Sequence, residues 1–163
     1  MRRAAPADSE QVLSVIVRAI RISAVGYYPE AALASWASDF TESGIRRSIE
    51  TTDSFVAVDG TRVVGFVNLE VEDVDLLFVD PDYGGRGVAR QMYAQVERLA
   101  RRRGLSRLTA TASARAEPVF LQFGFQVTSR FVLTDGKGVQ FDLAAMAHDM
   151  GAGGRVPTSA SSR

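Results

Sequence analysis

Between Asp75 and Gly104 the sequence passes from a short apolar strand, through a turn rich in glycine, directly into a long amphipathic helix. The apolar run at 76–79 ends before Pro81, because proline has no N–H to donate to a strand ladder. The backbone can then turn tightly and approach a ligand without a Cβ in the way, because the turn contains Gly84, Gly85 and Gly87. Since the first N–H groups of a helix have no partner within it, this junction is a predicted binding site for an anion such as a pyrophosphate.

The helix predicted after this turn begins at about Gly87 and ends at Gly104. Its apolar positions recur at helical spacing, at Val88, Ala89, Met92, Val96, Leu99 and Ala100. Charged and amide side chains fall largely on the other faces, which predicts a helix packed against a core on one side. The turn has neither the Gly-Lys-Ser/Thr ending of a Walker loop nor the G-x-G-x-x-G spacing of a dinucleotide-binding turn. It is therefore a phosphate loop of another type.

The remaining sequence predicts helices and strands on both sides of this unit. Before it we expect helices at 8–23, after Pro29 and at 45–50, a weak first strand at 1–5, and strands at 55–58, 62–70 and 74–79. After it we expect a strand at 108–111, a helix at 117–123 and strands at 125–133 and 139–146. Asp8 and Gln11 have the spacing of a helix capping box. One domain should span residues 1–150, and the Gly-, Ser- and Ala-rich tail 151–163 should be disordered.

Composition excludes several classes of function. The chain has 163 residues with 19 basic and 19 acidic side chains, so no excess of positive charge indicates a nucleic-acid partner. It contains no cysteine, which excludes a covalent cysteine intermediate and thiolate metal sites, and its one histidine, His148, is expected at the surface, so we expect no metal. The apolar segment 12–17 is too short to span a membrane or to serve as a signal sequence. We therefore expect a cytoplasmic protein without a membrane partner.

The turn YGGRGVA at 83–89 resembles the acyl-coenzyme A loop of the GNAT superfamily of N-acetyltransferases, whose pattern is Gln/Arg-x-x-Gly-x-Gly/Ala after a V-x-P strand end. Val79 and Pro81 match the strand end, and Gly87 and Ala89 match the two small positions of the loop. Gly84 departs from the pattern, because it stands where the family has Gln or Arg. We expect Arg86 to replace the phosphate contact that is lost there.

A second landmark extends the resemblance to about residue 150. The segment ARAEPVFLQFGF at 114–125 is similar to the N-x-x-A-x-x-F-Y-E-x-x-G-F helix end of the family. Ser113 falls where the family often has an asparagine, and Phe120 where it often has a tyrosine. The resemblance implies an α/β (α+β) fold of the GNAT type, in which helices flank a central mixed, mostly antiparallel twisted sheet that is splayed between strands 4 and 5.

The resemblance also implies the site and the reaction. Acetyl-CoA would be the co-substrate, with its arm along the backbone of the fourth strand and its diphosphate at the turn, held by Phe78, Val79, Gly84, Gly85, Arg86, Gly87, Val88, Ala89, Ser113 and Phe120. The acceptor would be an amine of a small molecule or a protein, and a homodimer is possible because many relatives are dimers. An amine attacks only when neutral, so a nearby carboxylate or an ordered water must take its proton. Asp75 is the first candidate, and Tyr27 and Tyr28 are candidate proton donors or pocket walls.

The sequence thus predicts an N-acetyltransferase that moves the acetyl group directly from acetyl-CoA to an amine. The replacement of the usual tyrosine by Phe120 leaves a second hypothesis open, a non-catalytic acyl-CoA-binding sensor or interaction module. A third hypothesis is an α/β scaffold that binds another phosphate ligand in the same turn.

Overall fold

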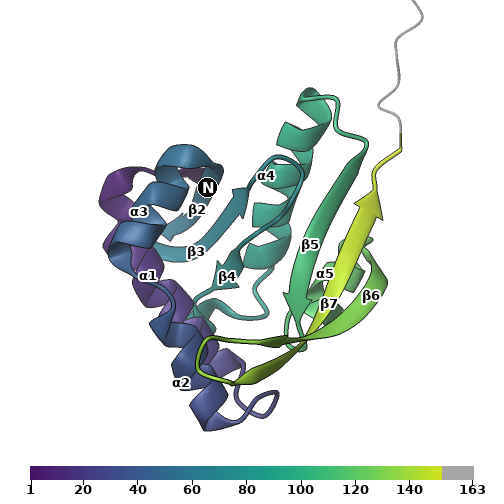
Figure 1. Cartoon of the computed structure of the whole chain (residues 1–163). Helices are drawn as coiled ribbons and strands as arrows, with labels where there is room; N and C mark the ends of the chain where they lie inside the picture. Colours follow the sequence, from purple (N-terminus) through teal and green to yellow (C-terminus); the bar gives the residue numbers. More distant parts are fainter. Residues whose placement is uncertain (152–163) are drawn as a thin grey trace, which may run out of the picture.

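A computed structural model describes residues 1–151 of the chain as two β-sheets with helices around them (Figure 1). The first sheet is antiparallel, with the order β1 (Arg2–Arg3), β2 (Asp53–Asp59), β3 (Arg62–Leu69) and β4 (Leu77–Val79). The second is also antiparallel, with the order β5 (Arg107–Ser113), β7 (Gln140–Asp149) and β6 (Gln126–Thr134). Apart from Gly151, the tail expected at 151–163 lies outside the described residues.

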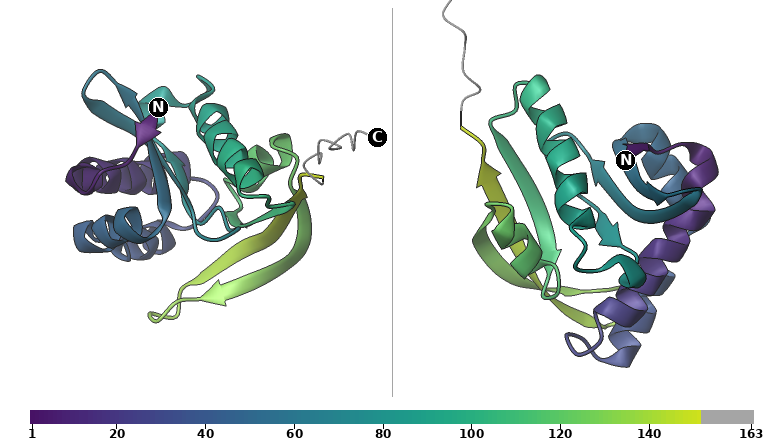
Figure 2. Two further views of the ribbon diagram at one scale, coloured as in Figure 1. Left: turned by 90° about the horizontal axis from the view of Figure 1, so that it is seen from above. Right: turned by 180° about the vertical axis from the view of Figure 1, so that it is seen from behind.

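The helices cover both faces of the first sheet (Figure 2). One face carries α1 (Ser9–Arg18), which continues as a π-helical turn (Ala19–Ser23), together with α2 (Glu30–Ser38) and α3 (Glu42–Thr51). The other face carries α4 (Val88–Arg102), and the short α5 (Glu117–Gln122) packs on the second sheet. Side chains of a strand alternate between faces, so β3 contributes Phe66 to the core under α1 and Val67 to the core under α4.

The two sheets separate between β4 and β5. Among the described residues one parallel bridge joins β5 to the segment before β4, where Val74 N donates to Thr109 O at 2.8 Å and Thr109 N donates to Glu72 O at 2.9 Å. Beyond this bridge the strands diverge, as Figure 1 shows. The predicted GNAT-type arrangement, mostly antiparallel and splayed between strands 4 and 5, is therefore confirmed.

The fourth strand is shorter than the expected range 74–79. Its regular part covers only Leu77–Val79, because the side chain of Asn68 takes the place of a main-chain acceptor on β3. Asn68 Oδ1 accepts from Leu76 N at 2.7 Å, while Asn68 N donates to Leu76 O at 3.1 Å. The ladder is thus interrupted at the residue where the strand was expected to continue.

Two local predictions at the ends of the chain are wrong. Asp8 does not cap α1 with Gln11, because its carboxylate binds the guanidinium of Arg2 at 2.7 and 2.8 Å and closes the 3₁₀ turn Pro6–Asp8 by accepting from Ala5 N. Gln11 Oε1 instead accepts from Val63 N at 2.9 Å. His148 is half-buried and not at the surface, since its Nδ1 lies 2.6 Å from the hydroxyl of Tyr93.

No helix within residues 1–151 is long and apolar enough to cross a bilayer.

Candidate functional site

The glycine turn forms an open cradle at the start of α4. Gly85 and Gly87 adopt φ angles of 72° and 78°, in the left-handed region that favours glycine. The first helical bond runs from Gln91 N to Gly87 O at 3.0 Å, so the N–H groups of the first helical residues have no partner within α4. A Cβ added at Gly85 or Gly87 would meet no atom within 4 Å, which means that the outer side of the turn is open. The cradle can therefore receive an anion at the positive end of the helix.

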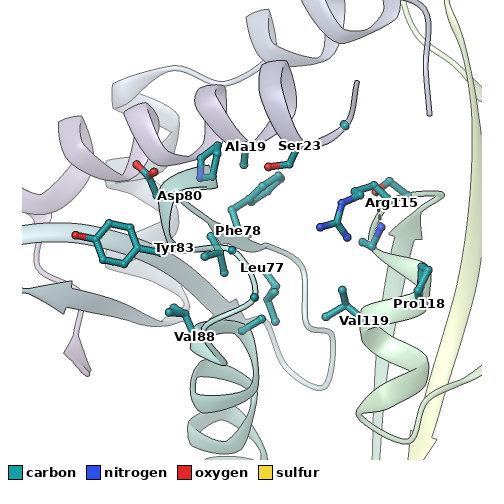
Figure 3. Close-up of a pocket in the computed structure, with 18 of the residues that line it drawn as sticks. Ala19, Ser23, Leu77, Phe78, Asp80, Tyr83, Val88, Arg115, Pro118 and Val119 are labelled. Carbon is teal, nitrogen blue, oxygen red and sulfur yellow. Dashed lines mark hydrogen bonds between the residues drawn. The ribbon is translucent and has the colours of Figure 1, made fainter. Parts of the chain in front are cut away.

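A cavity of about 510 Å³ extends from this turn along β4 to α5, and we call it the glycine-turn cavity (Figure 3). Nine of the ten predicted cofactor-binding residues line it, namely Phe78, Val79, Gly84, Gly85, Gly87, Val88, Ala89, Ser113 and Phe120. The tenth, Arg86, does not line the cavity itself, but its guanidinium lies 5.0 Å from the ring centroid of Tyr83, which does line it, in a cation–π contact. The phosphate contact expected of Arg86 stays a prediction.

Two cations that the sequence analysis missed line the glycine-turn cavity. Arg90 lies in the first turn of α4, with its guanidinium 5.9 Å from the ring centroid of Phe123. Arg115 follows β5 and points across the cavity toward β4 in Figure 3. The signal for Arg115 was present in the segment ARAEPVF, two residues after Ser113, but only the separation of β4 and β5 turns that segment toward the glycine turn.

The edge of β4 that faces β5 is open. Asp80 N donates to Val64 O and Asn68 N donates to Leu76 O, which places the bonds of residues 76, 78 and 80 on the side of β3. By the alternation of an antiparallel ladder, Leu77 and Val79 turn their N–H and C=O groups toward the gap. Val79 thus turns main-chain groups toward the gap, whereas the main chain of Phe78 faces β3 and its ring lines the cavity. An extended ligand can add to this edge as a further strand would.

A second cavity, of about 280 Å³, meets the first where β4 and β5 part, and we call it the aromatic cavity. The residues that line both cavities are Trp36, Leu77, Phe78, Ser113, Ala116 and Phe120. Its remaining wall comes from Tyr28, the end of α2, the segment before β4, Thr111 on β5 and the hairpin of β6 and β7. A ligand in the glycine-turn cavity and a ligand in the aromatic cavity would therefore touch at the open edge of β4.

Asp75, the predicted base, lines the aromatic cavity and is exposed to solvent. Its Oδ2 accepts from Nδ2 of Asn68 at 3.2 Å. Asn68 is fully buried, and its Nδ2 also lies 3.1 Å from the hydroxyl of Ser48. Asn68 thus orients Asp75, a role that was not predicted. An amide within an apolar strand is nevertheless a signal in the sequence, since buried polar groups need partners.

The two candidate tyrosines, Tyr27 and Tyr28, lie in different environments. Tyr28 is buried and lines the aromatic cavity, where its hydroxyl donates to Asp142 O at 2.8 Å and accepts from Ala114 N at 2.9 Å. Burial raises the pKa of Tyr28, so its hydroxyl stays protonated at neutral pH, and its proton is shared with the main chain. Tyr27 is 50% exposed and lines neither of the two cavities. The structure thus brings Asp75 and Tyr28 together without Tyr27.

The buried carboxylate of Asp80 holds the segment before the glycine turn in place. Asp80 is 2% exposed, lines the glycine-turn cavity and accepts from Asp82 N at 3.0 Å. It also binds Arg18 at 3.2 Å and Arg62 at 2.9 Å. Burial alone would raise the pKa of Asp80, but these hydrogen bonds outweigh it and hold the pKa below its usual value. The ionised carboxylate therefore ties α1 and β3 to the segment that leads into the cradle.

Residues 1–151 hold no group of three or more His, Cys, Asp and Glu side chains that could bind a metal ion. What the described residues offer instead is a main-chain anion cradle with two arginines, an open strand edge, and a carboxylate in an adjoining cavity. Such an arrangement can hold a long phosphate-bearing ligand beside a second, smaller molecule.

Comparison with known proteins places these features in a family. Residues 21–140 match the sequence model described as an acetyltransferase (GNAT) domain. The chain is 32% identical over 130 residues to the uncharacterized N-acetyltransferase YafP of Escherichia coli, covering 80% of this chain and 83% of that protein. It is 31% identical over 106 residues to the peptidyl-lysine N-acetyltransferase YjaB of Salmonella typhimurium, covering 60% and 72% of the two chains.

Solved structures show the same fold. A GCN5-related N-acetyltransferase from Rhodopseudomonas palustris superposes with a TM-score of 0.83 and 28% identity, over 91% of this chain and 93% of that one. The PaiA N-acetyltransferase of Thermoplasma acidophilum, solved in complex with coenzyme A, gives a TM-score of 0.75 at 17% identity, over 91% and 96%.

Proposed function

This chain belongs to the GNAT acetyltransferase family and uses acetyl-CoA as its acetyl donor, and from this premise we propose that the acetyl group passes directly to an amine in the aromatic cavity. The observation that carries the proposal is the meeting of the two cavities at the open edge of β4. A thioester that follows this edge from the glycine turn ends where the aromatic cavity begins.

The glycine-turn cavity fits the coenzyme in charge and in shape. The unpaired N–H groups at the start of α4 suit a diphosphate, and Arg90 and Arg115 supply positive charge beside them. The main-chain groups of Leu77 and Val79 suit the amides of a pantetheine arm. An N–H of the same edge can also donate to the oxygen that gains negative charge during acyl transfer, which is the kind of contact that most lowers such a barrier.

We propose Asp75 as the general base. An ammonium group has no lone pair with which to attack, so the acceptor must lose a proton, either directly to the Asp75 carboxylate or through a water molecule. Asn68 holds Asp75 at the mouth of the aromatic cavity and acts as a positioning residue. A free thiol has a pKa of about 8.5, so the leaving group can depart as a thiolate near neutral pH without receiving a proton from a side chain.

Tyr28 has a different role in this proposal. Its hydroxyl links Ala114 at the end of β5 to Asp142 on β7, and it keeps the wall of the aromatic cavity in place. Tyr27 and Arg86 stay predictions, since neither residue itself lines the glycine-turn cavity or the aromatic cavity. We also propose that the enzyme works in the cytoplasm, where metabolism produces acetyl-CoA; the homodimer stays a prediction.

The non-catalytic sensor suggested by Phe120 is not favoured, since the family to which the chain belongs is one of acetyltransferases. Phe120 packs against the rings of Phe123 and Phe125 and also lines both cavities, so its ring borders the place where the thioester and the acceptor would meet but brings no hydroxyl to it.

Replacing the base tests the proposal. An Asp75→Asn variant should lose about 10²- to 10⁴-fold in kcat while its affinity for acetyl-CoA is unchanged, because the carboxylate acts only on the acceptor. Glu72→Gln is the matched control, since Glu72 is exposed in the same segment but lines neither cavity. Release of free thiol from acetyl-CoA, followed with an amine panel, measures both. Equal rates in Asp75→Asn and the control would remove Asp75 from the mechanism.

A further inference from the structure

The aromatic cavity has a composition that narrows the acceptor, and this inference rests on the proposed function. Rings from three parts of the chain meet in its wall. Phe78 on β4 lies 6.2 Å from Trp36 and 6.0 Å from Phe40 between ring centroids, and Phe141 on β7 lies 6.3 Å from Trp36. All of these contacts are tilted or edge-to-face, so ring faces and edges alternate around the space. Such a wall favours a flat apolar body.

The cavity is small and is closed on one side. Its volume of about 280 Å³ is just below the usual range for small-molecule sites. The turn of the β6–β7 hairpin reaches across to α2 (Figure 1), where Ser35 Oγ donates to Asp135 Oδ2 at 2.6 Å and Lys137 Nζ donates to Ser38 Oγ at 2.7 Å. These two hydrogen bonds close the cavity between α2 and the β6–β7 hairpin. The aromatic cavity therefore suits a compact molecule better than an extended peptide.

The charges around the cavity have one sign. Asp39, Asp75 and Asp135 line it, and no Arg, Lys or His does so among the described residues. Hydrogen bonds from Ser35 and from the main chain hold the pKa of Asp135 below its usual value, so this carboxylate is ionised at neutral pH. Lys137 lies 3.6 Å from Asp39 and offsets part of the charge. The remaining excess attracts an ammonium ion and repels a carboxylate.

We propose that the acceptor is a small primary amine attached to an aromatic or similarly flat apolar body and free of any carboxylate. The ammonium form enters along the acidic rim, its ring packs against Trp36, Phe40 and Phe141, and its nitrogen comes to Asp75 beside the thioester. Transfer then forms the amide N–C bond and breaks the C–S bond of acetyl-CoA. The ammonium first gives up one proton through Asp75 to solvent, and the neutral amine then attacks the thioester carbonyl. Its second N–H proton goes to Asp75 as the C–S bond breaks, and the electron pair of that bond leaves with the thiolate.

Matched acceptors test the chemistry of the site. We expect 2-phenylethylamine to have a kcat/KM at least tenfold higher than phenylalanine, which adds only the carboxylate, and than n-butylamine, which lacks the ring. A lysine-containing peptide and spermidine complete the panel. Equal or faster acetylation of phenylalanine, n-butylamine, spermidine or the peptide would overturn the proposed acceptor class and leave acetyl transfer intact. Absence of acetylation of every amine would instead overturn the proposed function.

A pair of neighbouring substitutions tests the location of the site. Leu133 and Val132 lie side by side on β6 with exposures of 49% and 54%, but only Leu133 lines the aromatic cavity. We expect Leu133→Lys to raise the KM for 2-phenylethylamine about tenfold, a difference of about 1.4 kcal/mol, without changing the KM for acetyl-CoA. Val132→Lys should leave both unchanged. The proposal fails if the two variants behave alike.

Discussion

Two glycines at opposite ends of α4 separate the cost of a strained backbone from the loss of a ligand contact. Gly87, before the helix, has φ 78°, and Gly104, after it, has φ 74°. An added Cβ would meet no atom within 4 Å at either position. Alanine therefore introduces the same backbone strain at both sites and no clash at either. Only Gly87 lies in the wall of the glycine-turn cavity.

The expected magnitudes follow from this geometry. An alanine in the left-handed region costs about 1–2 kcal/mol in the free energy of unfolding, and for a chain of this size each kcal/mol lowers Tm by about 2–4 °C. Both variants should thus melt about 2–8 °C below the parent protein. At Gly87 the new methyl group also stands between the N–H donors and a phosphate. Losing one hydrogen bond to a charged group costs about 1.5–3 kcal/mol, which weakens coenzyme binding about 10- to 100-fold.

Calorimetric titration with coenzyme A, together with thermal melts of the free proteins, measures both quantities. Gly104→Ala should show the lower Tm and an unchanged Kd, whereas Gly87→Ala should show the lower Tm and the weaker Kd. An equal Kd for the two variants would refute the assignment of the diphosphate to the start of α4, whatever their stability.

Two further substitutions address the same end of the site. Gly84 has φ −59° and ψ 145°, and an added Cβ would lie 3.4 Å from Pro81 O, so Gly84→Gln should fold with an unchanged Tm. The glutamine should strengthen coenzyme A binding about two- to tenfold by adding one hydrogen bond to the phosphates. An unchanged Kd in titration calorimetry would count against this contact. The low pKa of Asp80 stabilises the fold above the pKa of the unfolded carboxyl, about 3.9, and this contribution is lost as pH falls through the lower folded value. Asp80→Asn should therefore lower the free energy of unfolding by about 1–3 kcal/mol at pH 7, and this free energy should decrease less in the variant than in the parent protein as the pH is lowered. Urea denaturation at several pH values from 7 to 3 measures it. The same decrease with pH in both proteins would disprove this role of Asp80.

Local sequence patterns were sufficient wherever one segment decides the outcome. The strands expected at 55–58 and 62–70, the helix after Gly87 and the strands expected at 125–133 and 139–146 were all predicted from adjacent residues, and the structure places β2, β3, α4, β6 and β7 there. They were predictable because turn residues and hydrophobic periodicity act over a few positions. Asp8, Gln11 and His148 were placed wrongly for the opposite reason. Their partners, Arg2, Val63 and Tyr93, come from other elements and compete with the local pattern.

The sequence by itself determined the glycine turn at the start of α4, because its glycines, its proline and its helix lie within one continuous stretch. Only the tertiary structure decided the aromatic cavity, whose wall joins α2, β4 and the β6–β7 hairpin across more than 100 positions of chain. The same holds for Arg115, which reaches the glycine-turn cavity only because β4 and β5 part. Local patterns specify a helix terminus, but a pocket between elements depends on how their faces pack, and that packing is a property of the whole chain.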